Sequence, residues 1–213
     1  MKVLVTGSSG LVGTSLTAAL QQESHNVLKA VRRPPTRSDE VFWNPDEGHI
    51  DQTQLHGVDA VVHLAGENIG RKRWTRRHKQ TILQSRVTGT RLIVEAIANL
   101  NLPPAVLVSA SAIGFYGDRG SETLTEDSGS GIGFRAEVCR EWEAATSSAE
   151  AAGIRVVKLR SGLVLSTDGG ILPYLLRPAS LGLSFRVGSG TQYWSWISIE
   201  DEVRAILFAL EKT

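Results

Sequence analysis

Three glycines near the start of the chain have the spacing of a phosphate-binding turn. They lie in residues 3–13, VLVTGSSGLVG, directly after a short apolar run that predicts a buried strand. Gly7 would permit the tight turn, Gly10 the close approach of a pyrophosphate, and Gly13 the packing of the next helix on the sheet. The alternative is a plain tight turn. In this context the spacing predicts a dinucleotide site, lined by Gly7, Ser9, Gly10, Leu11, Val12 and Gly13.

The end of the second predicted strand indicates which dinucleotide the turn would hold. Residues 26–31 form another apolar run, Arg32 and Arg33 follow it, and no acidic residue occurs before Asp39. An acid at this point would bind the ribose 2′-hydroxyl of NAD, whereas guanidinium groups bind a 2′-phosphate. Two solvated surface arginines are the alternative. The sequence therefore predicts that Arg32 and Arg33 select NADP(H) as the cofactor.

Alternating strands and helices must position these residues. Short runs rich in Val, Leu and Ala predict strands buried on both faces, at residues 2–6, 26–31, 60–64, 105–109 and 155–160. Apolar positions at helical spacing predict helices between them, at residues 11–22, 76–99 and 134–152. The alternation predicts an α/β fold, a Rossmann-type doubly wound parallel sheet with helices on both faces.

The alternating pattern ends after residue 160. Glycines and prolines interrupt residues 169–182, a Trp-rich run over 192–199 predicts a strand, and residues 200–210 predict a last helix. We expect an NADP-binding Rossmann domain over residues 1–165. Residues 166–213 would form the start of a small C-terminal substrate lobe.

The composition limits the partners and the location of the protein. Among 213 residues, 23 are Lys or Arg and 22 are Asp or Glu, so the formal net charge is +1. Such a chain has no global field that would attract nucleic acid or an anionic membrane. Neither a signal peptide nor a spanning run is visible, the single Cys139 has no disulfide partner, and the five histidines lack metal-ligand spacing. We expect a cytoplasmic protein without a metal, a nucleic-acid partner or a membrane anchor.

Further runs carry a family resemblance. The glycine turn, the run HLAG at residues 63–66 and the run VTGT at residues 87–90 together resemble the extended short-chain dehydrogenase/reductases. The runs LAGENI, RW, SR, WE, RSG and GSG, which begin at residues 64, 73, 85, 142, 160 and 188, are similar to an atypical epimerase-like subfamily with bacterial and human members. Members of that subfamily are longer. The resemblance therefore implies that part of the substrate lobe is missing from this chain.

The resemblance implies roles at the matched positions. Leu64 and Ala65 would lie beside the adenosine-side ribose and the pyrophosphate, and Gly66 would keep the strand end open. Arg86 stands where extended members usually carry an asparagine, and it would reach a cofactor phosphate or ribose. Simple packing of small residues at strand ends is the alternative for each position.

The resemblance also implies a nicotinamide side of the site. Ser109 or Ser111, at the end of the fourth predicted strand, would lie near the nicotinamide, where the family keeps its catalytic serine. Val164, in the run after the fifth predicted strand, would line the same end through its backbone.

The chain departs from the family at the catalytic pair. Family members use Tyr-x-x-x-Lys on one helix face, where lysine assists the tyrosine in moving a proton. No tyrosine here has a lysine four residues later, and the matching positions hold either Phe134 and Val138 or Arg135 and Cys139. The catalytic candidates that remain are Tyr116, Ser111 and Glu67. A packing role for Tyr116 and a salt bridge for Glu67 are the alternatives.

One cluster of basic residues could face the substrate. Residues 71–79, RKRWTRRHK, precede the part of the long helix that carries Arg86. A solvated surface is one explanation of this run, and contact with an anionic small-molecule substrate is the other. The sequence does not name the substrate or the oligomeric state.

Two functions fit these observations. The protein is either an NADP(H)-dependent oxidoreductase or epimerase-like enzyme with a substituted acid/base group, or a regulatory or redox-sensing module that binds NADP(H) without turnover. The missing Tyr–Lys pair favours the second function. The retained serines and the run Trp194–Trp196, which suits a pocket wall, favour the first.

Overall fold

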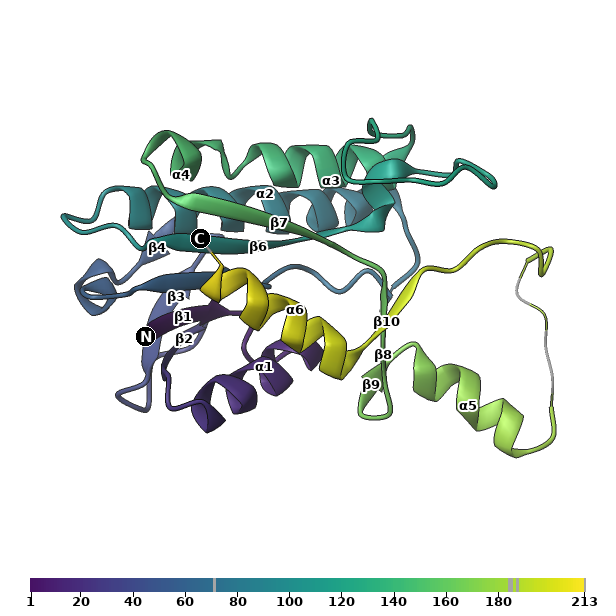
Figure 1. The fold of residues 1–213 in the computed structure, drawn as a ribbon, viewed down its shortest axis with the longest axis horizontal. Coiled ribbons are helices and arrows are strands. Elements are labelled where there is room, and N and C mark those ends of the chain that lie inside the picture. The colour runs from purple at the N-terminus through teal and green to yellow at the C-terminus, as the bar shows by residue number, and fades with distance from the viewer. Residues whose placement is uncertain (71, 184–185, 187, 213) are drawn as a thin grey trace.

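A seven-stranded sheet lies at the centre of the protein. The computed structural model describes residues 1–70, 72–183, 186 and 188–212. The strand order is β4-β3-β2-β1-β5-β6-β7, and all neighbours are parallel except β3 and β4 (Figure 1). This order confirms the Rossmann-type α/β fold. The strands are β1 (Lys2–Thr6), β2 (Asn26–Val31), β3 (Glu40–Asn44), β4 (His49–Ile50), β5 (Ala60–His63), β6 (Val106–Ala112) and β7 (Arg155–Ser161).

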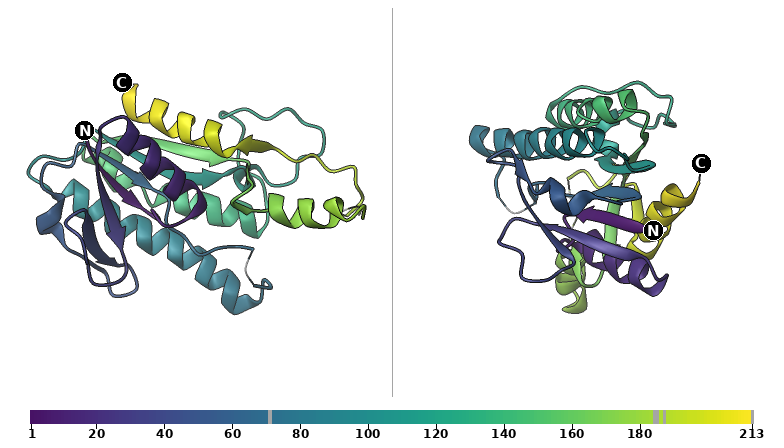
Figure 2. Two further views of the ribbon diagram at one scale, coloured as in Figure 1. Left: turned by 90° about the horizontal axis from the view of Figure 1, so that it is seen from below. Right: turned by 90° about the vertical axis from the view of Figure 1, so that its left-hand side faces the viewer.

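Helices cover both faces of this sheet. In Figures 1 and 2, α2, α3 and α4 lie on one face, and α1 and α6 lie on the other. Two short 3-10 turns, η1 (Gln52–Leu55) and η2 (Ile113–Tyr116), precede β5 and follow β6. The helices of the sheet layers are α1 (Leu11–Gln22), α2 (Arg76–Ala98), α3 (Phe134–Ala144), α4 (Ser147–Ala151) and α6 (Ile199–Glu211).

The alternation of side chains along each strand separates two cores. Leu4, Val61 and Leu107 pack with residues of α2 and α4, whereas their neighbours in sequence pack with α1 and α6. Because side chains of a strand alternate between faces, each strand end presents every second residue to the α2 and α3 layer. Thr6, His63, Ser109 and Ser111 fall in that register. This places polar side chains under one helix layer at the carboxyl ends of the strands.

The structure corrects several predicted element bounds. Strands β3 and β4 lie in a segment that the sequence analysis left without strands. The predicted helix over 134–152 divides into α3 and α4, where the hydroxyl of Thr146 donates to the carbonyl of Glu143 at 2.7 Å and competes with helix hydrogen bonds. The predicted strand over 192–199 is confined to β10, Trp196–Ser198.

A smaller sheet extends from the carboxyl edge of the main one. Its order is β10-β8-β9, with β8 at Leu163–Ser166 and β9 at Gly169–Gly170. Helix α5, Leu172–Ser180, follows it, buries none of its residues, and projects away from the main sheet (Figure 1). Helix α6 instead returns to the main core, where Val203 and Ile206 are buried. The division of the chain into two domains at residue 165 stays a prediction.

No helix in the described part of the chain is both long and apolar enough to span a membrane.

Candidate cofactor and active site

The glycine turn connects β1 to α1 as its spacing predicts. Gly7 has a φ of +68°, and a Cβ there would lie 2.9 Å from the backbone nitrogen of Ala65. A Cβ on Gly13 would lie 2.2 Å from the carbonyl oxygen of Gly7. At Gly10 the nearest protein atom to such a Cβ is the same oxygen, at 3.2 Å. Gly7 and Gly13 are therefore required by the fold, whereas Gly10 opens the backbone mainly toward the outside.

The start of α1 suits an anion. Gly10 is its N-cap, no side chain caps the free N–H groups, and its first turn holds no acidic residue. Helix N-termini of this kind bind phosphate through backbone donors and the helix dipole. Ser9 is exposed in the turn, and Leu11 and Val12 are half-buried beside it. The residues present therefore fit a pyrophosphate at the expected position.

Thr6 fixes the chain where β5 leaves the sheet. Its hydroxyl oxygen accepts the backbone N–H groups of Leu64 and Ala65, both at 3.2 Å, and lies 2.8 Å from Nδ1 of His63. With two N–H groups donated to that oxygen, the hydroxyl proton is directed to Nδ1. Burial lowers the pKa of His63 to about 4. The neutral imidazole and Thr6 thereby hold Leu64 and Ala65 next to the glycine turn.

Arg86 reaches the same strand exit from α2. Its guanidinium donates to the carbonyl oxygens of Glu67 at 3.1 Å and Ile82 at 3.2 Å, and it lies 4.9 Å from the ring centre of Trp142. A Cβ on Gly66 would lie 3.3 Å from its central carbon. Burial lowers the pKa of Arg86, and it takes part in none of the salt bridges among the described residues. This half-buried cation is available to an anion.

The two arginines after β2 have different surroundings. Arg33 donates to both carboxylate oxygens of Glu40, with Nη2–Oε1 at 2.6 Å and Nη1–Oε2 at 2.9 Å. The backbone N–H of Thr36 also donates to Glu40, and these contacts, led by Arg33, lower the pKa of Glu40 to about 2. Arg32 is exposed and makes no hydrogen bond or ion pair with the described residues. Arg32 is therefore the arginine that is free to meet a ligand.

A polar network joins the ends of β6 and β7. Ser111 donates to Oε1 of Glu143 at 2.6 Å, and Arg160 donates to both oxygens of that carboxylate at 2.9 Å. Nη1 of Arg160 also donates to the Tyr116 hydroxyl oxygen at 3.0 Å. Burial raises the pKa of Glu143, but the hydrogen bonds from Arg160 and Ser111 together hold it below its ordinary value.

The sequence pattern alone predicts no role for Glu143 or Arg160. Arg160 lies on the same face of β7 as the core residue Val156, and it pairs in register with Ser111 of β6. A cation at that alternating position, next to the expected serine, is the signal that could have been noticed. Ser111 and Tyr116 lie in one buried cluster, whereas Glu67 is half-buried and lies beside Arg86.

Helix α3 presents Arg135 and Cys139 to the turn after β6. A Cβ on Gly114 in η2 would lie 3.3 Å from Cβ of Arg135 and 3.6 Å from Sγ of Cys139. These two residues and Glu143 are spaced four apart and therefore share a helix face. Of the two registers that the sequence left open, the one with Arg135 and Cys139 faces the turn after β6. Burial raises the pKa of the Cys139 thiol.

The remaining nicotinamide-side candidates lie near these strand ends. Ser109 is buried, and its hydroxyl lies 3.4 Å from the carbonyl oxygen of Ala110. Val164 is half-buried on β8, whose hairpin with β9 approaches the glycine turn, since a Cβ on Gly169 would lie 3.3 Å from Leu11. The expected pocket wall is open, because Trp196 is 66% exposed.

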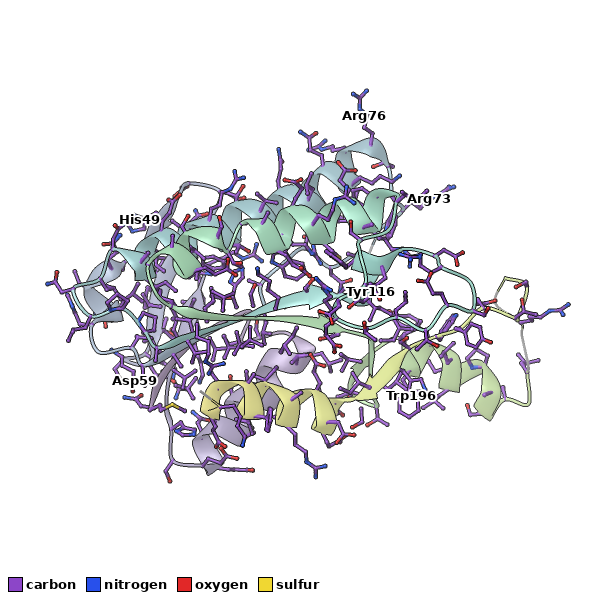
Figure 3. The ribbon with its side chains drawn as sticks, turned by 45° about the horizontal axis from the view of Figure 1, so that its top comes forward. His49, Asp59, Arg73, Arg76, Tyr116 and Trp196 are labelled. Carbon is purple, nitrogen blue, oxygen red and sulfur yellow. The ribbon has the colours of Figure 1, made fainter. Side chains whose placement is uncertain are left out.

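The basic segment is largely solvated. Arg73 and Arg76 are exposed, and Figure 3 shows them at the upper right edge of the molecule, with Tyr116 nearer its centre and Asp59 at the lower left. Trp74 packs on Phe134 with ring centres 5.6 Å apart, and Lys79 lies 5.1 Å from the same ring centre. Arg71 lies outside the described residues. The segment therefore covers the junction of α2 and α3 without an acidic partner in the structure described.

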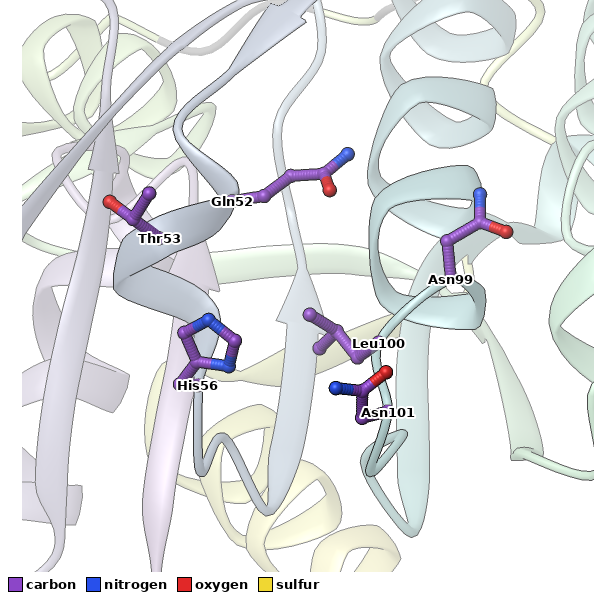
Figure 4. A pocket seen from close by; sticks show the side chains of 6 residues that line it. All are labelled: Gln52, Thr53, His56, Asn99, Leu100 and Asn101. Atoms are coloured by element: carbon purple, nitrogen blue, oxygen red, sulfur yellow. The ribbon is translucent and has the colours of Figure 1, made fainter.

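A separate surface pocket lies at the amino ends of β5 and β6, away from the glycine turn (Figure 4). Its lining residues are Gln52, Thr53, His56, Asn99, Leu100 and Asn101. Within the described ranges, no group of His, Cys, Asp and Glu side chains could hold a metal ion. The residues that line this pocket include none of those predicted to bind the cofactor.

Comparison with known proteins identifies the family. The model of the NAD dependent epimerase/dehydratase family matches residues 3–213. The chain belongs to this family. The resemblance to epimerase-like short-chain dehydrogenase/reductases is thereby confirmed. An epimerase family protein of Mycobacterium bovis, Mb2239, is 47% identical over 208 residues, which are 98% of this chain and 68% of that protein.

Two solved structures have the same fold. The human epimerase family protein SDR39U1, solved with NADPH, is 34% identical with a TM-score of 0.87, over 99% of this chain and 70% of that one. A nucleoside-diphosphate sugar epimerase from Corynebacterium glutamicum is 43% identical with a TM-score of 0.87. That match covers 99% of this chain but 43% of the Corynebacterium chain, so this chain spans less than half of its length.

Proposed function

We propose that this epimerase/dehydratase family member binds NADP(H). The carrying observation is that Arg32 follows β2 exposed and unengaged, at the place where NAD-specific sites carry an acid. The open start of α1 suits the pyrophosphate, and the neighbouring carboxylate, Glu40, is occupied by Arg33. The human relative, which was solved with NADPH, supports the same choice.

The proposed reaction is an oxidoreductase or epimerase-like step on a small molecule. When bound, NADPH supplies a hydride. Ser111 lies at the end of β6 and Tyr116 follows this strand, at the carboxyl edge of the sheet where open α/β sheets bind their ligands. The chain lacks Tyr-x-x-x-Lys, so the proton must come from another group, and Tyr116 is the proposed donor. Arg86 and the exposed basic segment favour an anionic substrate.

A second function is favoured by the engagement of these hydroxyls. Ser111 already donates to Glu143, the Tyr116 oxygen already accepts from Arg160, and both side chains are buried. A site whose polar groups are satisfied by the protein can bind NADP(H) without turning over a substrate. In that case the protein is a regulatory or redox-sensing module.

Cofactor binding and turnover are tested separately. Calorimetric titration should give at least tenfold tighter binding of NADPH than of NADH, about 1.4 kcal/mol. Equal affinities would contradict the NADP(H) proposal. The absorbance of bound NADPH is then followed with a panel of aldehydes, ketones and their phosphorylated derivatives. Oxidation by any member supports the enzyme, whereas tight binding without oxidation across the panel supports the regulatory module.

A further inference from the structure

Tyr116 and Arg160 come from neighbouring elements and meet at the carboxyl edge of the sheet. Tyr116 ends the η2 turn after β6, and Arg160 lies near the end of β7, in register with Ser111. Nη1 of Arg160 lies 3.0 Å from the phenolic oxygen of Tyr116. On the basis of the proposed function, we propose that Arg160 is a positioning residue that orients the Tyr116 hydroxyl for proton donation to the substrate.

The direction of this hydrogen bond determines where the phenolic proton points. A guanidinium has N–H donors and no acceptor, so the Tyr116 oxygen is the acceptor in this contact. The phenolic hydrogen must therefore point away from Arg160. No other hydrogen-bond partner of this hydroxyl occurs among the residues that the structure describes. The proton of Tyr116 is thus left for a group that the protein itself does not supply.

Arg160 is held from several sides, so its donor has a fixed position. Nε and Nη2 each donate to Glu143 at 2.9 Å, and Nη1 also donates to the carbonyl oxygen of Glu126 at 3.2 Å. The central guanidinium carbon lies 3.5 Å from the ring centre of Phe115. Ser111 fixes the carboxylate of Glu143 in turn. Because the guanidinium of Arg160 is already held in place, it loses little side-chain entropy when the Tyr116 hydroxyl gives up its proton.

The balanced step requires only groups already named. With NADPH bound, a carbonyl substrate would take up hydride at carbon while Tyr116 would donate the proton at oxygen, so the products would balance as an alcohol and NADP⁺. Tyr116 is left as a phenolate, whose negative oxygen faces Nη1 of Arg160. The phenolate then recovers its proton from water. Arg160 would thereby provide the neighbouring cation that lysine provides in relatives with Tyr-x-x-x-Lys.

The contact can be tested without any substrate. Tyr174 and Tyr193 are 72% and 81% exposed, so replacing both with Phe leaves Tyr116 as the only tyrosine in a folded protein. The Raman Fermi doublet of tyrosine reports whether the phenolic oxygen accepts a hydrogen bond. We expect the acceptor ratio in this background, its loss in Arg160→Met and its recovery in Arg160→Lys. If Arg160→Met leaves the intensity ratio of the doublet unchanged, the role of Arg160 is overturned, whereas the proposed function is not affected.

A double-mutant cycle tests the positioning role in catalysis. On a compound that the panel identifies, Arg160→Met should lower kcat at least tenfold, and Arg160→Lys should restore most of it. Tyr116→Phe should lower kcat by about 10²-fold, and adding Arg160→Met to it should cost nothing further. Equal losses from Arg160→Met in both backgrounds would make its role merely structural. If Arg160→Met does not fold, Glu143→Gln, which weakens the hold on Arg160, takes its place in the cycle.

The Raman and turnover experiments together distinguish failure of the proposed enzyme from failure of the role of Arg160. The Raman signature with no oxidation of NADPH by any panel member overturns the proposed enzyme, and the positioning role with it. Turnover without the Raman signature overturns the role of Arg160 and leaves the enzyme standing.

Discussion

Arg33 and Glu40 form a bidentate ion pair that ties the end of β2 to the first residue of β3, with oxygen–nitrogen distances of 2.6 and 2.9 Å. The Glu40 side chain is nearly buried, whereas the Arg33 side chain is 54% exposed. The pair therefore uses the donors of Arg33 within the protein and leaves Arg32 exposed beside it. Two adjacent arginines that look equivalent in the sequence therefore have different surroundings.

Substitution at these positions should separate cofactor choice from stability. Arg32→Glu should abolish the preference for NADPH over NADH, because a carboxylate repels the 2′-phosphate and can bind the ribose hydroxyl. Arg33→Gln should lower the melting temperature, because it removes the ion pair, and should keep at least part of the preference. Calorimetry with both cofactors and thermal melts of each variant measure the two effects. A preference lost in Arg33→Gln but kept in Arg32→Glu would reverse the assignment.

The glycine turn predicts two distinct responses to added side chains. Gly10→Val should keep a cooperative thermal transition but lose the stabilisation by NADPH, because its side chain occupies the space of the pyrophosphate. Gly13→Ala should lose stability without any ligand, because its Cβ would lie 2.2 Å from the carbonyl oxygen of Gly7. Thermal melts with and without NADPH measure both changes. Full stabilisation of Gly10→Val by NADPH would place the phosphate site elsewhere.

The sequence was sufficient for the centre of the fold. Strands β1, β5 and β6 are largely buried between helices on both faces, so each appears as a mainly apolar run. Strands β2 and β7 are less buried and carry charged residues, but their Val and Leu residues still indicate a strand. The glycine turn was equally visible, because backbone packing at Gly7 and Gly13 excludes side chains and leaves a local spacing. Both features depend on neighbours in sequence or on burial of a whole segment.

Contacts between distant segments were not predictable in the same way. The β3 segment is five residues long, and its first residue, Glu40, pairs with Arg33 in the loop that precedes it. Glu143 and Arg160 are separated by 17 residues and meet only because α3 packs on β6, the strand that pairs with β7. The sequence indicated that Tyr116 and Ser111 lie near each other. It did not indicate which side chains form hydrogen bonds with their hydroxyl groups.

His63 makes stability depend on pH in a defined window. It is fully buried, and burial lowers its pKa from the usual 6.5 to about 4. The unfolded chain takes up a proton below pH 6.5, which the folded chain does not, so stability should fall as the pH is lowered from 6.5 toward 4. The full loss is about 3 kcal/mol, since one pKa unit corresponds to about 1.4 kcal/mol.

Denaturant unfolding at a series of pH values measures this loss. The part between pH 6.5 and 5 lies above the ordinary pKa of carboxylates, so histidine dominates there. His63→Gln should be less stable at pH 7 and should lose most of the slope in that interval. An unchanged slope in His63→Gln would assign the dependence to other histidines.

Restoring the family's lysine should destabilise this protein. Of the two registers that the resemblance allows, the one that faces η2 has Cys139 at the lysine position. Cys139 is 4% exposed and lies within the electrostatic reach of the half-buried Arg86. A lysine there would bury a second cation within reach of Arg86, which forms none of the salt bridges among the described residues, although the carboxylates of Glu67 and Glu143 lie nearby. We expect Cys139→Lys to cost at least about 2 kcal/mol of unfolding free energy, and Cys139→Ser much less. The denaturant midpoints of both variants measure the difference.

Repulsion between a lysine at position 139 and Arg86 can be tested in the Arg86→Met variant. In Arg86→Met, the same Cys139→Lys substitution should cost less, because the repelling cation is gone, and the two changes should therefore be non-additive. Equal costs in both backgrounds would show that the size of lysine is the obstacle rather than its charge. A smaller cost would mean that a cation at position 86 and a cation at position 139 exclude each other. The absence of Tyr-x-x-x-Lys would then follow from the presence of Arg86.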